Sequence, residues 1–125
     1  MKLTRAEEQI MQVLWDLEEA FVKDILERLE GPRPAYNTVS TIVRILEKKG
    51  FVSHHAYGKS HKYYPLISRE EYTRTTMKNF VKDYFSDSFE KMVSFFARER
   101  DIDLEEMEDI MRIMQQEIKK QKNHG

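Results

Sequence analysis

Hydrogen-bonding and basic side chains recur at regular spacing along residues 37–48, and they are the groups in this sequence best suited to chemistry. At ~100° per residue, an α-helix would place the apolar residues of this segment on one face and these polar residues on the other. Amide, hydroxyl and guanidinium groups can hydrogen-bond to DNA base edges and to phosphates. The residues of this helix that we predict to contact DNA are Asn37, Thr38, Ser40, Thr41, Arg44 and Lys48.

Charge is distributed unevenly along the chain, although the formal net charge is only -1. Residues 1–30 contain four basic and eight acidic residues, whereas residues 31–66 contain six basic residues and a single acidic one, Glu47. A local charge of +5, six minus one, in an otherwise acidic chain is typical of a polyanion site. An ordinary solvated helix face would mix acidic and basic residues, so the acid-free polar face favours nucleic-acid binding.

A β-hairpin with a basic tip is predicted to follow this helix. Residues 51–57 and 61–66 are short β-prone stretches on either side of Gly58. A small basic hairpin can lie on the phosphate backbone or in the minor groove of DNA. We therefore add Lys59 and Lys62 to the residues predicted to contact DNA.

Other kinds of site are disfavoured. His54, His55 and His61 would lie close together on the hairpin, but no acidic residue lies between Glu47 and Glu70 and the chain has no Cys, so we expect no metal site. The absence of Cys also excludes disulfides and a cysteine nucleophile. Because the sequence shows no Gly-rich phosphate loop, catalytic triad spacing or paired carboxylates, we expect neither an enzyme nor a bound cofactor.

Three helices are predicted to precede the hairpin. Thr4 and Glu7 have capping-box spacing and begin a helix over residues 5–18, and apolar residues predict a short second helix over residues 21–29. Asn37 is predicted to cap the third helix, which ends at Gly50. Three helices followed by a hairpin define a winged helix-turn-helix.

The remaining sequence predicts only helices, so the fold class is mainly α. Pro65 ends the second strand, and Ser68 and Glu71 have capping-box spacing, which places a domain boundary between a winged-helix domain at residues 1–68 and a helical domain at 69–125. So short a helical module buries little apolar surface by itself, which predicts a homodimer. A ligand cavity is the alternative for its aromatic and Met residues. The predicted dimerisation residues are Phe80, Tyr84, Phe89, Met92, Val93, Phe96, Met107, Ile110, Met111 and Met114.

No apolar run approaches the roughly 18 residues of a membrane span, and no apolar segment follows the basic residues at the N-terminus. We therefore expect no membrane insertion and a cytoplasmic location.

Three stretches carry a more specific signal: LTRAEEQIMQVLW at residues 3–15, NTVSTIVRILEKKGFVSHH at 37–55 and KYYPLISREEY at 62–72. Together they resemble the penicillinase-repressor family, which includes the β-lactamase and methicillin-resistance repressors. The resemblance covers essentially the whole chain. It implies a homodimeric transcriptional repressor that binds double-stranded DNA at palindromic operators, with Thr38, Thr41 and Arg44 on the recognition helix and a helical dimerisation domain at the C-terminus.

The resemblance also bears on regulation. Family members controlled by a membrane sensor protease are inactivated by cleavage in the dimerisation domain, at an Asn-Phe bond in the best-known repressors. The corresponding residues here are Phe95 and Phe96, so the Asn is replaced. A copper-responsive branch of the family carries C-terminal Cys pairs, and this chain has none.

A second class of function remains open, namely a winged-helix protein-interaction module without DNA binding. Such a module would keep the fold and the dimer but would not need an acid-free basic face. The sequence retains that face, which favours the DNA-binding repressor.

Overall fold

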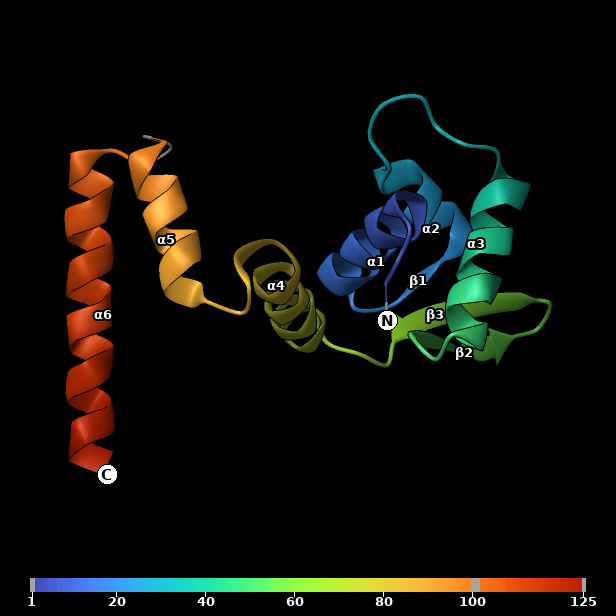
Figure 1. Cartoon of the computed structure of the whole chain (residues 1–125). Coiled ribbons are helices and arrows are strands. Elements are labelled where there is room, and N and C mark those ends of the chain that lie inside the picture. Colours follow the sequence, from blue (N-terminus) through green and yellow to red (C-terminus); the bar gives the residue numbers. More distant parts are fainter. Residues whose placement is uncertain (1, 100–101, 125) are drawn as a thin grey trace. The chain divides into compact units, whose positions relative to one another are not determined.

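Helices α1 (Arg5–Leu17), α2 (Val22–Arg28) and α3 (Tyr36–Lys48) pack with a small antiparallel sheet in the N-terminal part of the chain (Figure 1). The computed structural model describes residues 2–99 and 102–124. Contacts divide the chain into two units between Thr76 and Met77. The predicted three helices and hairpin are confirmed.

The sheet contains one strand more than the hairpin that the sequence predicts. Strand β1 (Ala20–Phe21) pairs with β3 (Ser60–Pro65), which also pairs with β2 (Val52–Tyr57), in the order β1-β3-β2. Gly58, with a φ of 62°, occupies the first position of the two-residue turn between β2 and β3, where a positive φ favours Gly. The β2–β3 hairpin is the wing.

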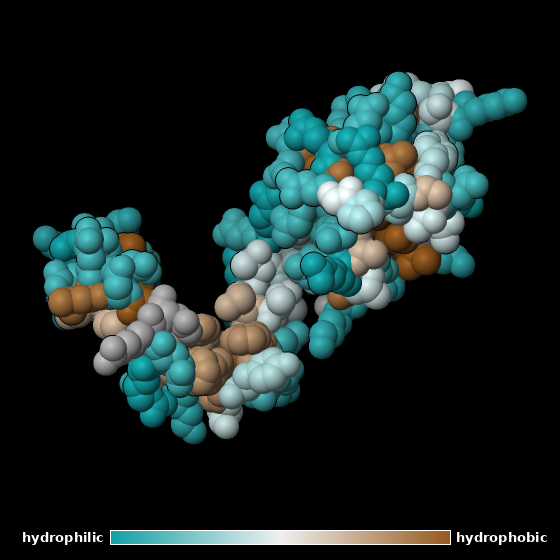
Figure 2. All heavy atoms as spheres, turned by 90° about the horizontal axis from the view of Figure 1, so that it is seen from above, coloured by the Kyte–Doolittle hydropathy of each residue, from teal (hydrophilic) through white to brown (hydrophobic). Residues whose placement is uncertain are grey.

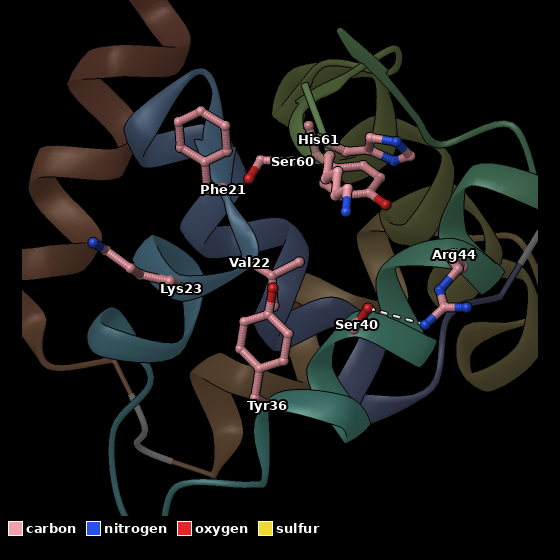
Figure 3. A pocket seen from close by; sticks show the side chains of 10 residues that line it. Phe21, Val22, Lys23, Tyr36, Ser40, Arg44, Ser60 and His61 are labelled. Atoms are coloured by element: carbon pink, nitrogen blue, oxygen red, sulfur yellow. Dashed lines mark hydrogen bonds between the residues drawn. The ribbon is translucent and has the colours of Figure 1, made fainter. Parts of the chain in front are cut away.

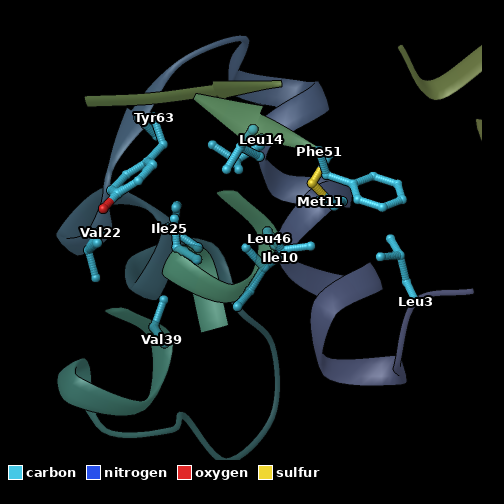
Figure 4. Packing of buried hydrophobic residues seen from close by; sticks show 13 residues of the cluster. Leu3, Ile10, Met11, Leu14, Val22, Ile25, Val39, Leu46, Phe51 and Tyr63 are labelled. Atoms are coloured by element: carbon cyan, nitrogen blue, oxygen red, sulfur yellow. The ribbon is translucent and has the colours of Figure 1, made fainter. Parts of the chain in front are cut away.

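The core of this unit comes from the apolar faces that the sequence predicts. Side chains from all three helices meet those of β2 and of the residue that precedes it (Figure 4). Burying a large apolar side chain contributes about 1.5–3 kcal/mol, so this cluster fixes where α3 lies on the unit. The largest fully buried side chains are Phe51, Ile10, Met11, Leu14, Ile25, Leu46, Val39, Val43 and Val52.

The start of α3 differs from the prediction that Asn37 caps it. The N-cap is Ala35, whose carbonyl accepts from the N–H groups of Thr38 and Val39 at 3.0 and 3.2 Å, and Asn37 lies inside the first turn. A methyl side chain cannot accept a hydrogen bond, so Ala35 gives this terminus no side-chain cap. The exposed Asn37 amide remains available for other partners.

An ion pair joins the start of α1 to the end of α3. Glu7, only 4% exposed, accepts from the Lys49 ammonium at 2.8 Å and completes a capping box with Thr4. Burial by itself raises the pKa of Glu7, but the hydrogen bonds from Lys49 and Thr4 outweigh it and lower that pKa below its ordinary value of 4.5.

Acid is therefore expected to lower the free energy of unfolding by weakening the Glu7–Lys49 pair. A carboxylate with a lowered pKa stabilises the fold above the unfolded value of 4.5, and this contribution is lost as the pH falls through the folded pKa. Glu7→Gln should cost about 1–2 kcal/mol at neutral pH, less than a fully buried pair because the Lys49 side chain is 40% exposed. Urea unfolding at neutral and acidic pH measures the difference. The difference in unfolding free energy between the wild type and Glu7→Gln should narrow below pH 4.5. A difference that stays constant would contradict a lowered pKa for Glu7. The exposed Glu27→Gln is the control.

The first turns of α4 (Arg69–Phe85) belong to the N-terminal unit. The Tyr72 ring lies 5.6 Å from that of Trp15 and 6.1 Å from that of Phe51 between centroids, and the Arg69 guanidinium contacts the Asp16 carboxylate at 2.6 Å. The domain boundary between residues 68 and 69 stays a prediction. The contacts show that a fragment meant to fold alone should extend to Thr76.

The second unit contains the rest of α4, α5 (Phe89–Arg98) and α6 (Leu104–His124). Ser88 and Asp103 begin the two later helices: their side-chain oxygens accept from the N–H groups of Lys91 and Glu106 at 3.2 and 2.8 Å. Within residues 77–99 and 102–124 no side chain is buried. Apolar side chains therefore remain on the surface of these helices (Figure 2).

None of the helices in the described part of the chain is long and apolar enough to cross a lipid bilayer.

Candidate nucleic-acid interface

Helix α3 presents a polar face to solvent, opposite the side that holds it in the core. Val39, Val43 and Leu46 are 0% exposed. Ser40 is half-buried, at the edge of the polar face. The exposed polar residues of the helix are Asn37, Thr38, Thr41, Arg44 and Lys48, as the helical spacing predicts.

Two of these polar groups are held by bonds within the helix. The Thr41 hydroxyl donates to the Asn37 carbonyl at 2.8 Å, and the Arg44 guanidinium donates to the Ser40 hydroxyl at 3.1 Å. Neither bond reaches another element. Thr41 and Arg44 can therefore exchange these bonds for partners on DNA without disturbing the core.

A cleft of about 570 Å³ lies between α3, the start of α2 and the wing (Figure 3). Tyr36, Ser40 and Arg44 line it from α3, and His61 lines it from β3. Its other lining residues are Phe21, Val22, Lys23, Lys59, Ser60 and Tyr63. The cleft joins the helix face to the wing, so a single extended ligand could touch both.

Basic groups surround this cleft. Lys23, Arg44 and Lys59 contribute three positive charges, and none of the described residues that line it is acidic. Burial, with a smaller contribution from the nearby Glu47 carboxylate, raises the pKa of Tyr63, so its hydroxyl stays protonated and neutral. The lining therefore suits an anion that carries several hydrogen-bond acceptors, such as a phosphodiester chain.

Two lysines of the basic segment are already paired with acidic residues of the N-terminal third of the chain. Lys49 binds Glu7, and the Lys62 ammonium lies 3.1 Å from the Glu19 carboxylate and 5.5 Å from the centroid of the Phe21 ring. Lys62 was predicted to contact DNA, but its position at the β1–β3 pairing makes it less available than Lys59 at the turn.

Some residues of this surface were missed by the sequence reasoning. Lys23 lies in the net acidic segment, so its sequence position gave no signal, and only the packing of α2 beside the wing brings it to the cleft. Tyr36 is 53% exposed at the start of α3. Tyr57 packs edge-on against Phe21, with centroids 5.9 Å apart, which holds the wing against the start of α2.

The wing histidines form a stacked arrangement. His54 Nδ1 lies 2.6 Å from the Glu47 carboxylate, and the His54 and His61 rings stack with centroids 4.0 Å apart at 8°. His55 points to the other face of β2 and stacks on Tyr64 at 4.8 Å. Within the described residues no group of three His, Cys, Asp or Glu side chains is arranged to hold a metal ion.

The unit contains three helices, and the third has an exposed polar face with a basic wing beside it. This arrangement defines a winged-helix DNA-binding unit. The family model described as penicillinase repressor matches residues 3–116, and the chain belongs to this family. Family members are transcriptional regulators and not enzymes, and the homologues of this chain are transcriptional repressors with a DNA-binding winged-helix domain.

Alignments with related proteins extend over most of both chains. The chain is 26% identical to the methicillin resistance regulatory protein MecI of Mammaliicoccus sciuri, covering 90% of this chain and 93% of that protein. It is 22% identical to the penicillinase repressor of Bacillus licheniformis, covering 97% and 95%. The solution structure of the DNA-binding domain of the repressor BlaI matches with a TM-score of 0.51 at 26% identity, over 57% of this chain and 88% of that one. The predicted family and fold class are confirmed.

Proposed function

We propose that this chain represses transcription as a homodimer on a palindromic operator, with α3 in the major groove of DNA and the wing on the flanking backbone. The observation that carries the proposal is the face of α3 with exposed Asn37, Thr38, Thr41, Arg44 and Lys48, which carries no acidic side chain and continues into the basic cleft. Side chains of these types can distinguish base pairs in the major groove. Occupation of a promoter by such a dimer would block transcription.

The DNA-contacting residues that we propose are those at the helix face and the wing tip. Thr38, Thr41 and Arg44 are exposed on α3, where they can reach base edges. Lys48 and Lys59 carry exposed ammonium groups suited to phosphates. Lys23 joins them from the cleft.

The homodimer is supported by the apolar surface of the second unit. Tyr84 and Leu104 are each 72% exposed, and none of the side chains described in residues 77–124 is buried. Three amphipathic helices without a buried core need a partner, and a second copy supplies an identical apolar surface. The other large exposed apolar residues of this unit are Met77, Phe89, Val93, Phe95, Ile110, Met111, Ile113, Met114 and Ile118.

We also propose that the Phe95–Phe96 bond is the site at which a membrane-sensor protease would inactivate the repressor. Both residues lie inside α5, and Phe95 contacts Phe85 with centroids 5.7 Å apart. A protease binds extended chain, so α5 must unwind before cleavage. Intact-mass measurement of the chain recovered from cells grown with and without a β-lactam tests this, and an uncut chain under both conditions would contradict it.

Steep dependence of binding on salt is the expected signature of the proposed interface. If Lys23, Lys48 and Lys59 each engage about one phosphate, a dimer neutralises about six, and the slope of log K against log[salt] should be about -5. Fluorescence anisotropy measures this slope with a duplex taken from the region upstream of the gene that encodes this protein. A slope shallower than about -2 would contradict binding by the helix face and the wing together.

A further inference from the structure

We propose that His61 takes up a proton when the chain binds DNA and that the resulting imidazolium donates a hydrogen bond to a backbone phosphate in the cleft. The inference rests on the proposed DNA-binding function and adds a phosphate-binding residue to it. It also makes DNA affinity depend on pH. The proton comes from solvent and binds one ring nitrogen, and no covalent bond to DNA forms.

His61 is placed at the cleft by its neighbours rather than free at the tip of a flexible wing. It lies second in β3, and its ring stacks on that of His54 at 4.0 Å and contacts that of Tyr63 at 6.1 Å between centroids. Its side chain is exposed and lines the same cleft as Arg44 (Figure 3). Lys59 also lines this cleft. A phosphate bound by Lys59 would therefore lie near the imidazole.

The bond between His54 and Glu47 determines how the stacked pair carries its protons. An ionised carboxylate can only accept, so His54 Nδ1, 2.6 Å from Glu47 Oε2, must carry the hydrogen of this bond. This bond engages the Glu47 carboxylate with His54 rather than with His61. In the free protein, a charge on the His61 ring would instead lie close to the cations that line the cleft, and like charges disfavour each other's ionised forms.

The other charges around His61 act in the same direction in the free protein. Glu47 is the acidic residue of this group, and His54 already engages it. The ionisable groups that face His61 are Lys23 from α2, Tyr36, Arg44 and Glu47 from α3, His54 from β2, Lys59 from the turn and Tyr63 from β3.

Binding of DNA reverses this electrostatic environment. A phosphodiester chain in the cleft would neutralise Lys23 and Lys59 and bring negative charge to within hydrogen-bond reach of His61. An opposite charge at that distance favours the protonated imidazole. Because a proton is bound more tightly in the complex than in the free protein, linkage requires that DNA is bound more tightly as the pH falls.

The experiment measures the affinity of the full chain for a mixed-sequence duplex of about 30 bp, long enough for two half-sites about a helical turn or two apart. Fluorescence anisotropy at fixed salt between about pH 8 and pH 6 gives the slope of log K against pH. Each proton taken up steepens this slope by up to one, or about tenfold in affinity per pH unit. The wild type should bind more tightly at low pH, and His61→Gln should lose most of this dependence.

His55→Gln is the matched control, because the neighbouring imidazole stacks on Tyr64 and does not line the cleft. It should keep the pH slope of the wild type. NMR titration of the His61 ring protons gives a direct second measurement, in which the midpoint should move to higher pH when the duplex is added.

Two results would overturn the inference, and they have different meanings. Equal pH slopes for the wild type and His61→Gln, with both proteins still bound to the duplex, would refute the role of His61 alone. Failure of the wild type to bind the duplex at every pH would refute the proposed DNA-binding function and this inference with it.

Discussion

A fragment of residues 1–76 is expected to fold as a monomer and to bind operator DNA about 100-fold or more weakly than the full chain. The fragment keeps the core and the contacts of Tyr72 with Trp15 and Phe51, but it lacks the exposed apolar helices of the second unit. In a dimer, binding of one DNA-binding unit to its half-site raises the effective concentration of the second unit at the other half-site. A monomeric fragment lacks this effect. Sedimentation velocity and fluorescence anisotropy measure the two effects.

A shorter fragment supplies the control for this experiment. Residues 1–68 lack Arg69 and Tyr72, so the Asp16 ion pair and the aromatic contact with Trp15 are lost. This fragment should unfold at a lower temperature than residues 1–76, which would show that the first turns of α4 stabilise the DNA-binding unit. A full chain that is monomeric at micromolar concentration, or a 1–76 fragment that binds as tightly as the full chain, would refute the dimer.

Arg44→Ala is expected to reduce operator affinity by about 1–3 kcal/mol while leaving binding to scrambled DNA nearly unchanged. The guanidinium is exposed on α3 and its bond to Ser40 is local, so its planar donors are free to pair bidentately with a guanine. Lys59→Ala at the turn of the wing should instead weaken both duplexes alike and reduce the salt slope by about one. Anisotropy on both duplexes at matched salt distinguishes base reading from phosphate contact.

Lys62→Ala is the matched control for Lys59→Ala, since both are wing lysines but Lys62 is paired with Glu19. It should change affinity for both duplexes less than Lys59→Ala does. Equal proportional losses on operator and scrambled DNA for Arg44→Ala would mean that Arg44 contacts only phosphate. Thr38, Ser40 and Thr41 would then remain as the candidates for base reading.

Helical periodicity predicted the helices and the two faces of α3 because burial and spacing are local properties of one segment. Val39, Val43 and Leu46 recur at intervals that place them on one side of any helix, and all three are fully buried. Strand β1 was missed because two residues are too short to show alternation, and only pairing with β3 defines it. The prediction placed the N-cap at Asn37 because of its side chain. The cap is set by the backbone instead: Ala35 has the extended conformation of an N-cap residue, and the helix begins with Tyr36.

The sequence predicts only the part of the candidate interface whose basic residues lie close together along the chain. Arg44 and Lys59 lie within the basic segment and also meet at the cleft. The pairing of Lys49 with Glu7 and of Lys62 with Glu19 joins residues 42 and 43 positions apart, which no local pattern records. The same limit concealed Lys23, which reaches the cleft through the packing of α2.

The purely local bonding of the α3 surface has a consequence for how such a regulator could be redirected to new promoters. Thr41 and Arg44 bond only within their own helix, while other residues hold that helix in place. Exposed positions of this kind usually tolerate substitution within about 0.5 kcal/mol of stability. In the proposed function, target choice and folding are therefore assigned to separate residues, so a designer could exchange the outer side chains for new base preferences while keeping the scaffold and its melting temperature.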